Sequence, residues 1–203
     1  MTDEAAGRPS LGGLSASVGQ NVRAERQRQG ISIRALAKRL GVSPSFLSQF
    51  ELGQCKAAVS TLFAITSELN MSLDELLEKS APGEGPRPGH SGTTNQGADN
   101  PADYLTLQSG VRWKRLADTG PGHHVQFLLT EYDPGSDSAP RGAPQVHKGD
   151  DYGYVLKGTL TIELDGETKT LHAGDSIQIR GDIPHRLRNL GDEVVQAIWC
   201  TVD

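Results

Sequence analysis

The chain has 203 residues, of which 35% are hydrophobic, and a formal net charge of −5. It has no apolar run of about 18 residues, the length that a membrane-spanning helix needs, and its first residues lack the apolar segment of a secretory signal. We therefore expect a cytoplasmic protein with no membrane partner. Its two cysteines, Cys55 and Cys200, lie far apart in sequence and are expected to be reduced thiols.

Charge is distributed unevenly along the chain. Residues 20–60 contain seven basic and two acidic side chains, whereas residues 103–203 contain ten basic and fifteen acidic ones. We therefore expect that only the basic segment, residues 20–60, binds a polyanion.

Composition divides the chain into two domains. Residues 81–102 hold five Gly and four Pro but no Val, Ile, Leu, Met or aromatic residue. Such a segment cannot bury enough apolar surface to offset its ordering entropy, so it is predicted to be a flexible linker. The expected organisation is a disordered tail at 1–13, a helical domain at 14–80, the linker at 81–102 and a β domain at 103–203.

Five helices are predicted before the linker, at residues 15–29, 32–40, 44–52, 60–69 and 73–79. Serines suited to N-caps and glycines suited to helix ends stand at their boundaries: Ser32, Ser43, Ser72, Gly30, Gly41 and Gly53. The second and third segments are short and are joined by a turn that contains Gly41. This spacing predicts a helix-turn-helix.

The stretch SIRALAKRLGVSPSFLSQFELG, residues 32–53, resembles the XRE or phage-repressor family of DNA-binding domains. The resemblance covers residues 15–79 and implies that 44–52 is a recognition helix for a double-stranded DNA operator. It places Ser45, Ser48 and Gln49 at base edges, where Gln can bond adenine at two positions. It places Arg34, Ser43 and Lys56 near phosphates. The loop QCKAAVST after Gly53 departs from the usual family pattern, which leaves its backbone contacts open.

Short runs rich in Val, Ile, Leu, Thr and aromatic residues follow the linker and predict an all-β domain. The expected strands are residues 123–132, 152–158, 159–166, 176–180 and 194–200. Asp165 and Gly166 form a two-residue hairpin signal between strands.

Residues 125–200 resemble the cupin family, a double-stranded β-helix barrel. The first cupin motif falls on Gln145, His147, Asp151 and Gly158, and the second on Gly174, His185 and Asn189. Four positions depart from the family pattern: Gln145 replaces a histidine, Asp151 a glutamate, Arg180 a proline and Asp182 a glycine.

The resemblance implies that His147, Asp151 and His185 converge inside the barrel, with Gln145 at the rim of the site. Two imidazoles and one carboxylate suit Fe, Mn, Ni or Zn. Because Gln is a weak ligand and Asp has a shorter arm than Glu, a metal-free pocket for a polar effector remains an equal alternative.

The resulting hypothesis is a non-enzymatic, dimeric or higher homo-oligomeric transcription regulator, in which an XRE-type reader is joined to a cupin sensor of a small-molecule effector. A second hypothesis is a mononuclear non-heme iron oxygenase with a helical domain that no longer reads DNA. A third, an antitoxin that represses its own operon, depends on a neighbouring gene that one chain does not reveal.

Overall fold

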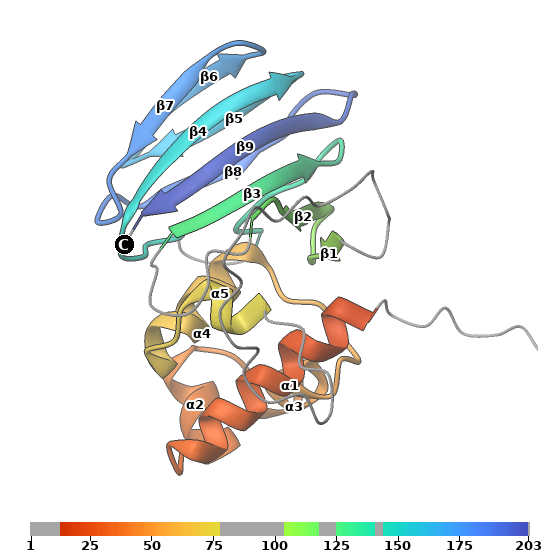
Figure 1. Ribbon diagram of the computed structural model, residues 1–203, viewed down its shortest axis with the longest axis vertical. Helices are drawn as coiled ribbons and strands as arrows, with labels where there is room; N and C mark the ends of the chain where they lie inside the picture. The colour runs from red at the N-terminus through yellow and green to blue at the C-terminus, as the bar shows by residue number, and fades with distance from the viewer. Residues whose placement is uncertain (1–12, 78–103, 118–124, 141–143, 203) are drawn as a thin grey trace, which may run out of the picture.

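The computed structural model describes residues 13–77, 104–117, 125–140 and 144–202. Helices form one half of the molecule and strands the other (Figure 1). The predicted linker and nearly all of the predicted tail lie outside the described residues. Within the described part, no helix is long and apolar enough to cross a membrane, and Cys55 and Cys200 are free thiols.

Residues 13–77, the part of the helical half that the structure describes, contain five helices, as predicted. They are α1 (Gly13–Arg28), α2 (Ile33–Arg39), α3 (Pro44–Glu51), α4 (Val59–Leu69) and α5 (Leu73–Leu77). Ser32 and Ser43 are N-caps, since their Oγ atoms accept hydrogen bonds of 3.1 Å from Ala35 N and Phe46 N. These bonds satisfy amide groups that have no partner within the helix, which fixes the starts of α2 and α3.

α1 crosses α3 at very close range. A Cβ atom on Gly19 would lie 2.2 Å from the carbonyl oxygen of Phe50. Only glycine fits there, because any side chain would push the two helices apart. Beneath this crossing lies an apolar core from all five helices, whose fully buried members include Val22, Leu36, Leu47, Leu62, Ile65, Leu69 and Leu76.

Among the described residues of the β half, nine strands form two antiparallel sheets. The six-stranded sheet has the order β1 (Tyr104–Thr106), β2 (Val111–Arg115), β3 (Val125–Tyr132), β9 (Val195–Val202), β4 (Asp150–Lys157), β7 (Ser176–Ile179), and the three-stranded sheet has the order β6 (Glu167–His172), β5 (Thr159–Leu164), β8 (His185–Arg188). The predicted two-domain fold, helical and then all-β, is therefore confirmed. β1, β2, β6 and β8 were not predicted, because they are short or carry mostly polar residues.

The predicted hairpin turn joins β5 to β6. Leu164 pairs with Glu167, which leaves Asp165 and Gly166 as the two turn residues. Both have positive φ, 46° and 84°. These angles match the twist of the flanking strands and favour Asp-Gly at this turn.

The two halves contact each other through α4 and the segment before it. Ser60 N donates a 3.1 Å hydrogen bond to Ser138 O, and Gln108 N donates one of 2.8 Å to Ala57 O. The Phe63 ring meets the Trp113 ring edge-on at 6.1 Å between centroids. The two halves are therefore in direct contact and are not connected through the predicted linker alone.

Candidate functional site

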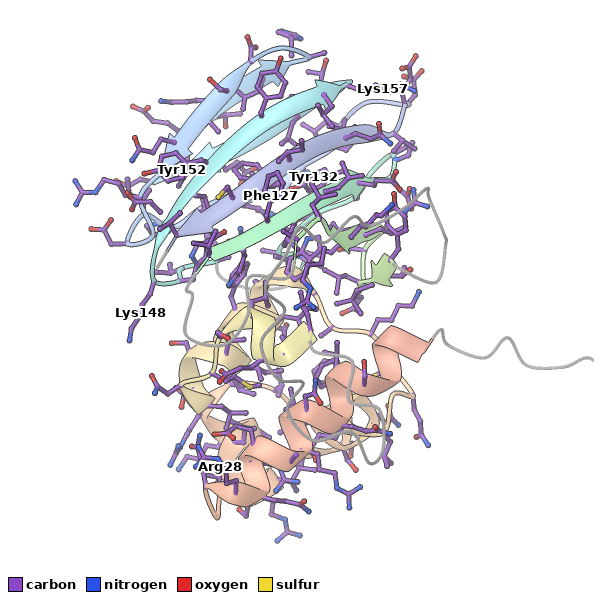
Figure 2. The ribbon with its side chains drawn as sticks, in the orientation of Figure 1. Arg28, Phe127, Tyr132, Lys148, Tyr152 and Lys157 are labelled. Atoms are coloured by element: carbon purple, nitrogen blue, oxygen red, sulfur yellow. The ribbon has the colours of Figure 1, made fainter. Side chains whose placement is uncertain are left out.

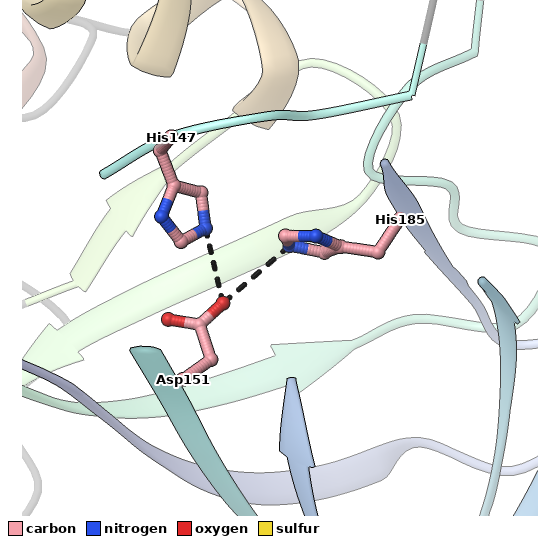
Figure 3. Close-up of side chains that lie close together, drawn as sticks. All are labelled: His147, Asp151 and His185. Atoms are coloured by element: carbon pink, nitrogen blue, oxygen red, sulfur yellow. Dashed lines mark ion pairs between the residues drawn. The ribbon is translucent and has the colours of Figure 1, made fainter. Parts of the chain in front are cut away.

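His147, Asp151 and His185 converge in the interior of the β half (Figure 3). Asp151 lies on β4, His185 begins β8, and His147 lies in the segment that leads into β4. One ligand atom from each residue lies within 4.8 Å of the other two. β4 and β8 belong to different sheets, and an antiparallel bridge between Gln145 and His185 joins the start of the first motif to the second.

All three side chains are buried, with exposed fractions of 5% for His147, 7% for Asp151 and 0% for His185. Asp151 Oδ2 lies 3.0 Å from His147 Nε2 and 3.4 Å from His185 Nε2. On its other oxygen the carboxylate accepts a hydrogen bond from the Thr201 hydroxyl. Thr201 faces Asp151 across the β4–β9 pair, so strand register supplies this contact.

Backbone carbonyls fix how each imidazole is oriented. His147 Nδ1 lies 2.9 Å from Lys148 O, and His185 Nδ1 lies 2.9 Å from Ile183 O. A carbonyl oxygen can only accept, so each Nδ1 carries the proton. In a neutral ring the Nε2 lone pair then faces Asp151, which is the arrangement that second-shell carbonyls give to histidine metal ligands.

The carboxyl group of Asp151 is ionised at neutral pH. Burial raises its pKa, but the His147 and His185 imidazoles, where they carry a proton toward the carboxylate, and the Thr201 hydroxyl lower the pKa by more, so the net pKa lies well below the ordinary value. A buried carboxylate beside two nitrogen lone pairs requires a positive charge nearby. That charge can be a proton on one ring or a metal cation.

Gln145 lies deeper than the expected rim position. It is 4% exposed, and its backbone exchanges hydrogen bonds of 2.9 and 3.0 Å with the backbone of His185. Among the described residues, Gln145 Oε1 is buried without a hydrogen-bond partner, and buried His185 Nε2 has none besides the Asp151 carboxylate 3.4 Å away. Because such atoms usually have partners, a ligand that supplies one fits the chemistry of this site.

The remaining positions of the two motifs, Gly158, Gly174 and Asn189, determine the course of the backbone. Gly158 and Gly174 have positive φ of 82° and 96°, and a Cβ at Gly158 would lie 2.9 Å from Val195 Cγ2. The Asn189 side chain is buried and donates to the carbonyls of Tyr132 and Glu193. These three residues hold turns and do not join the His–Asp–His cluster.

Phe63 is a neighbour of the site that the sequence did not reveal. This α4 residue stacks on the His147 ring, with centroids 4.3 Å apart and an interplanar angle of 21°. In the sequence it is one apolar position of an amphipathic helix, which predicts a place in the helical core. Only the docking of the two halves brings it to the β half.

The expected DNA-contact residues lie mainly on the exposed faces of α2 and α3. Arg34, Ser45 and Gln49 are exposed, and Ser48 is half-buried. Ser43 is exposed but already caps α3 through its hydroxyl. Lys56 lies half-buried in a cavity of about 590 Å³ between the two halves, whose lining includes Phe46, Cys55, Gln108 and Asp133.

One arginine of the basic segment is not available to a polyanion. Arg26 is buried, and its guanidinium makes two hydrogen bonds to the Glu51 carboxylate, of 2.6 and 2.8 Å. Arg28, by contrast, extends from the end of α1 with 73% of its side chain exposed (Figure 2). The basic character of the surface is therefore weaker than the count of basic residues suggests.

Comparison with known proteins matches both halves to families. Residues 22–76 match the helix-turn-helix family and residues 128–201 match the cupin domain family. The transcriptional regulators PuuR and SutR of Escherichia coli are 28% and 26% identical, over 85% and 84% of this chain and 88% and 85% of their own length. The chain therefore combines a helix-turn-helix domain with a cupin domain, the organisation of XRE-type regulators that carry a cupin domain.

A solved structure supports the same architecture for this regulator. A Vibrio cholerae transcriptional regulator with a helix-turn-helix domain is 18% identical and has a TM-score of 0.65, covering 94% of this chain and 97% of its own. At that identity the likeness concerns the fold alone. Because the full-length named relatives are transcription regulators, the expectation of a non-enzymatic, DNA-binding regulator is confirmed.

Proposed function

We propose that this DNA-binding regulator senses a small polar effector in its cupin domain, through a divalent metal held by His147, Asp151 and His185. The supporting observation is the convergence of two imidazoles and an ionised carboxylate in a buried site. Fe, Mn, Ni and Zn suit this donor set. A bound metal would supply the missing positive charge and a Lewis-acidic anchor for the effector.

Buried Gln145 Oε1 and His185 Nε2 support ligand binding at this place. A metal-free pocket would use the same groups to bind the effector directly, with a proton in place of the cation. The oxygenase alternative has no support from the full-length relatives, which are regulators.

The experiment that tests the metal is elemental analysis of full-length protein purified without added metal or chelator. We expect about one equivalent per chain in the wild type and a large loss in His185→Ala and Asp151→Asn. Arg180→Ala, which changes an exposed residue outside the cluster, serves as the control. Folded wild-type protein can also be purified without metal and then incubated with Fe²⁺, Mn²⁺, Ni²⁺ and Zn²⁺. If it binds none of these ions, the metal site is contradicted, and the metal-free pocket that binds the effector directly is the function that stands.

On the DNA side, α3 is the proposed recognition helix, with Ser45, Ser48 and Gln49 facing the bases of an operator. Arg34 and Ser43 are proposed to meet phosphates, together with Lys56. The exposure of Arg34, Ser45 and Gln49 supports this assignment. We also propose that the protein works in the cytoplasm, where its operator lies.

A two-fold dimer is proposed, because a single DNA-binding domain of this size contacts only one half-site. Dimers of such domains span half-sites about 34–36 Å apart.

The outer face of the six-stranded sheet offers a suitable surface for the dimer contact. On β4, Tyr152, Tyr154 and Leu156 are each about half exposed, at 45%, 46% and 45%. Register places Cys200 and Phe127 in the row of Tyr152, and Ile198 and Leu129 in the row of Tyr154; Phe127 and Tyr152 are labelled in Figure 2.

The dimer is tested by sedimentation of full-length wild type and Tyr154→Glu. A charge at the centre of this face should shift the protein toward monomer and weaken operator binding. Lys157→Glu, at the end of the same strand, is the control for the added charge. A Tyr154→Glu protein that remains a dimer would place the contact elsewhere.

A further inference from the structure

We propose that Phe63 couples the cupin site to the DNA reader: it holds His147 in place from the helical half, so that a change at the site moves α4 and, through it, the segment behind the recognition helix. This inference rests on the proposed sensing function and adds the route by which the two halves communicate.

The first observation is the contact itself. The Phe63 ring stacks on His147 at 4.3 Å, and His147 in turn meets His185 edge-on at 5.1 Å between ring centroids. Phe63 is 8% exposed, and its ring contacts both Trp113 and His147 of the β half. A helix of the reader therefore forms one wall of the cupin site, and a ligand that shifts the His147 ring must also shift Phe63 or lose the stacking.

The second observation is how α4 begins. Its N-cap residue is Ala58, which has no side-chain oxygen to accept from the first amide groups. Ser60 N instead donates to Ser138 O in the β half. Ser138 also holds β8, because its N donates to Leu187 O and its hydroxyl accepts from Leu187 N at 3.0 Å. The start of α4 is thus capped by a residue bonded to the strand that carries His185.

Both contacts lead back to the DNA-facing elements. Phe63 and Ser60 lie in the first five residues of α4, and the segment before it carries Lys56 and then Ala57, whose carbonyl accepts from Gln108. That segment follows α3 directly. Movement of α4 against the β half would therefore shift Lys56 relative to α3. Both Lys56 and α3 are proposed to face DNA.

A double-mutant cycle tests the coupling without a known effector. The readout is the affinity of full-length protein for a duplex that the wild type selects from a random library, and the variants are His147→Ala, Phe63→Leu and the double variant. We expect His147→Ala to change DNA affinity by about fivefold or more, a typical size for coupling between sites, and to have little effect when Phe63→Leu is already present. Equal effects of His147→Ala in both backgrounds would overturn the proposal.

Leu62→Ala is the matched control for damage to the helical half, since it removes a buried side chain of the same helix and leaves the stacking ring. The cycle between Leu62→Ala and His147→Ala should be additive. An equally large coupling with Leu62 would mean that general loosening of α4 explains the result, and this outcome too would overturn a specific role for Phe63.

A titration with Co²⁺ alone separates this proposal from the function on which it rests. If the wild type binds Co²⁺ and its DNA affinity changes, Phe63→Leu should still bind Co²⁺ with a reduced change in DNA affinity. An undiminished change would contradict the coupling. Failure of the wild type to bind Co²⁺ would count against the metal site, while the double-mutant cycle would still decide the role of Phe63.

Discussion

At the scale of single residues, the same residue type has different roles according to its burial. Arg26 and Arg28 stand two positions apart on α1, yet the first is held in a buried pair with Glu51 and the second in an exposed pair with Glu25. Exposed pairs contribute little because water screens them, whereas a buried charge that loses its partner is costly. The structure therefore separates a stabilising arginine from a solvated one.

Arg26→Ala should lower the free energy of unfolding by about 3–5 kcal/mol, because it leaves the Glu51 carboxylate buried and unpaired. Arg28→Ala is the matched control and should cost no more than about 1 kcal/mol. Urea denaturation of both variants measures the difference. Similar losses in the two variants would show that the Arg26–Glu51 pair is solvated in solution.

Gln49→Ala should weaken binding to the selected operator by about 1–3 kcal/mol and relax the preference at one base pair, because a Gln side chain can bond adenine at two positions. Lys56→Ala should weaken operator and non-specific DNA alike and reduce the salt dependence of binding. Titrations against operator, single-base variants and unrelated duplex distinguish the two. A uniform loss for Gln49→Ala on every sequence would remove it from the base-reading face.

At the scale of elements, residues 133–140, which lie between β3 and β4, link the halves. Asp137 in this segment accepts a 2.8 Å hydrogen bond from Arg186 Nε on β8 and another of 2.8 Å from Ala139 N. Next to it, Ser138 caps α4. The ion pair with Arg186 thus holds in place the residue that satisfies the start of a helix in the other half.

The Asp137 carboxyl should make stability depend on acid pH. Burial raises its pKa, but Arg186, the Ala139 amide and Arg188 lower it by more, so the folded pKa lies below the ordinary value. A lowered pKa gives stability that is present above the unfolded pKa of about 3.9 and is lost as the pH falls toward the folded pKa.

The difference in unfolding free energy between wild type and Asp137→Asn should therefore be constant at neutral pH and shrink as the pH falls below about 3.9. Denaturation curves recorded across this range measure it, with Asp192→Asn, an exposed acid in the turn before β9, as the control. A difference that stays the same at every pH would show that the Asp137 charge contributes nothing.

At the scale of the whole molecule, the helical half is docked on the β half and shares side chains with it. Phe63 and the Ser138 cap of α4 both belong to this contact. The two halves are therefore predicted to be folded units that lose stability when separated. The predicted linker at 81–102 offers the place to separate them.

Cleavage at a protease site introduced within 81–102 should yield two folded pieces. The isolated helical piece should be less stable than the same half in the intact chain, because separation removes the contacts of Phe63 with Trp113 and His147. Its binding to operator should also be weaker if the β half carries the dimer contact. Thermal melts and DNA titrations of the purified piece test this, and a piece as stable and as tightly bound as the intact chain would contradict it.

The sequence by itself determined the helices and the location of the two motifs. Helix starts are set locally, because Ser32 and Ser43 bond to amides three residues later, and the Asp165–Gly166 turn is set by its own backbone angles. The resemblance to the two cupin motifs, which can be read from the sequence alone, identified the His147–Asp151–His185 set as well. Short strands such as β1 and β8 escaped prediction, because their pairing depends on distant partners and not on their own composition.

Tertiary structure alone decided which of these groups meet, and how. It brought β4 and β8 together across the interior, buried Gln145 beside His185 and paired Arg26 with Glu51. It also placed Phe63 of α4 against His147, a contact between residues 84 positions apart that no local pattern encodes. Local hydrogen bonds fix an element from its own residues, whereas docking depends on shapes that exist only once both halves have folded.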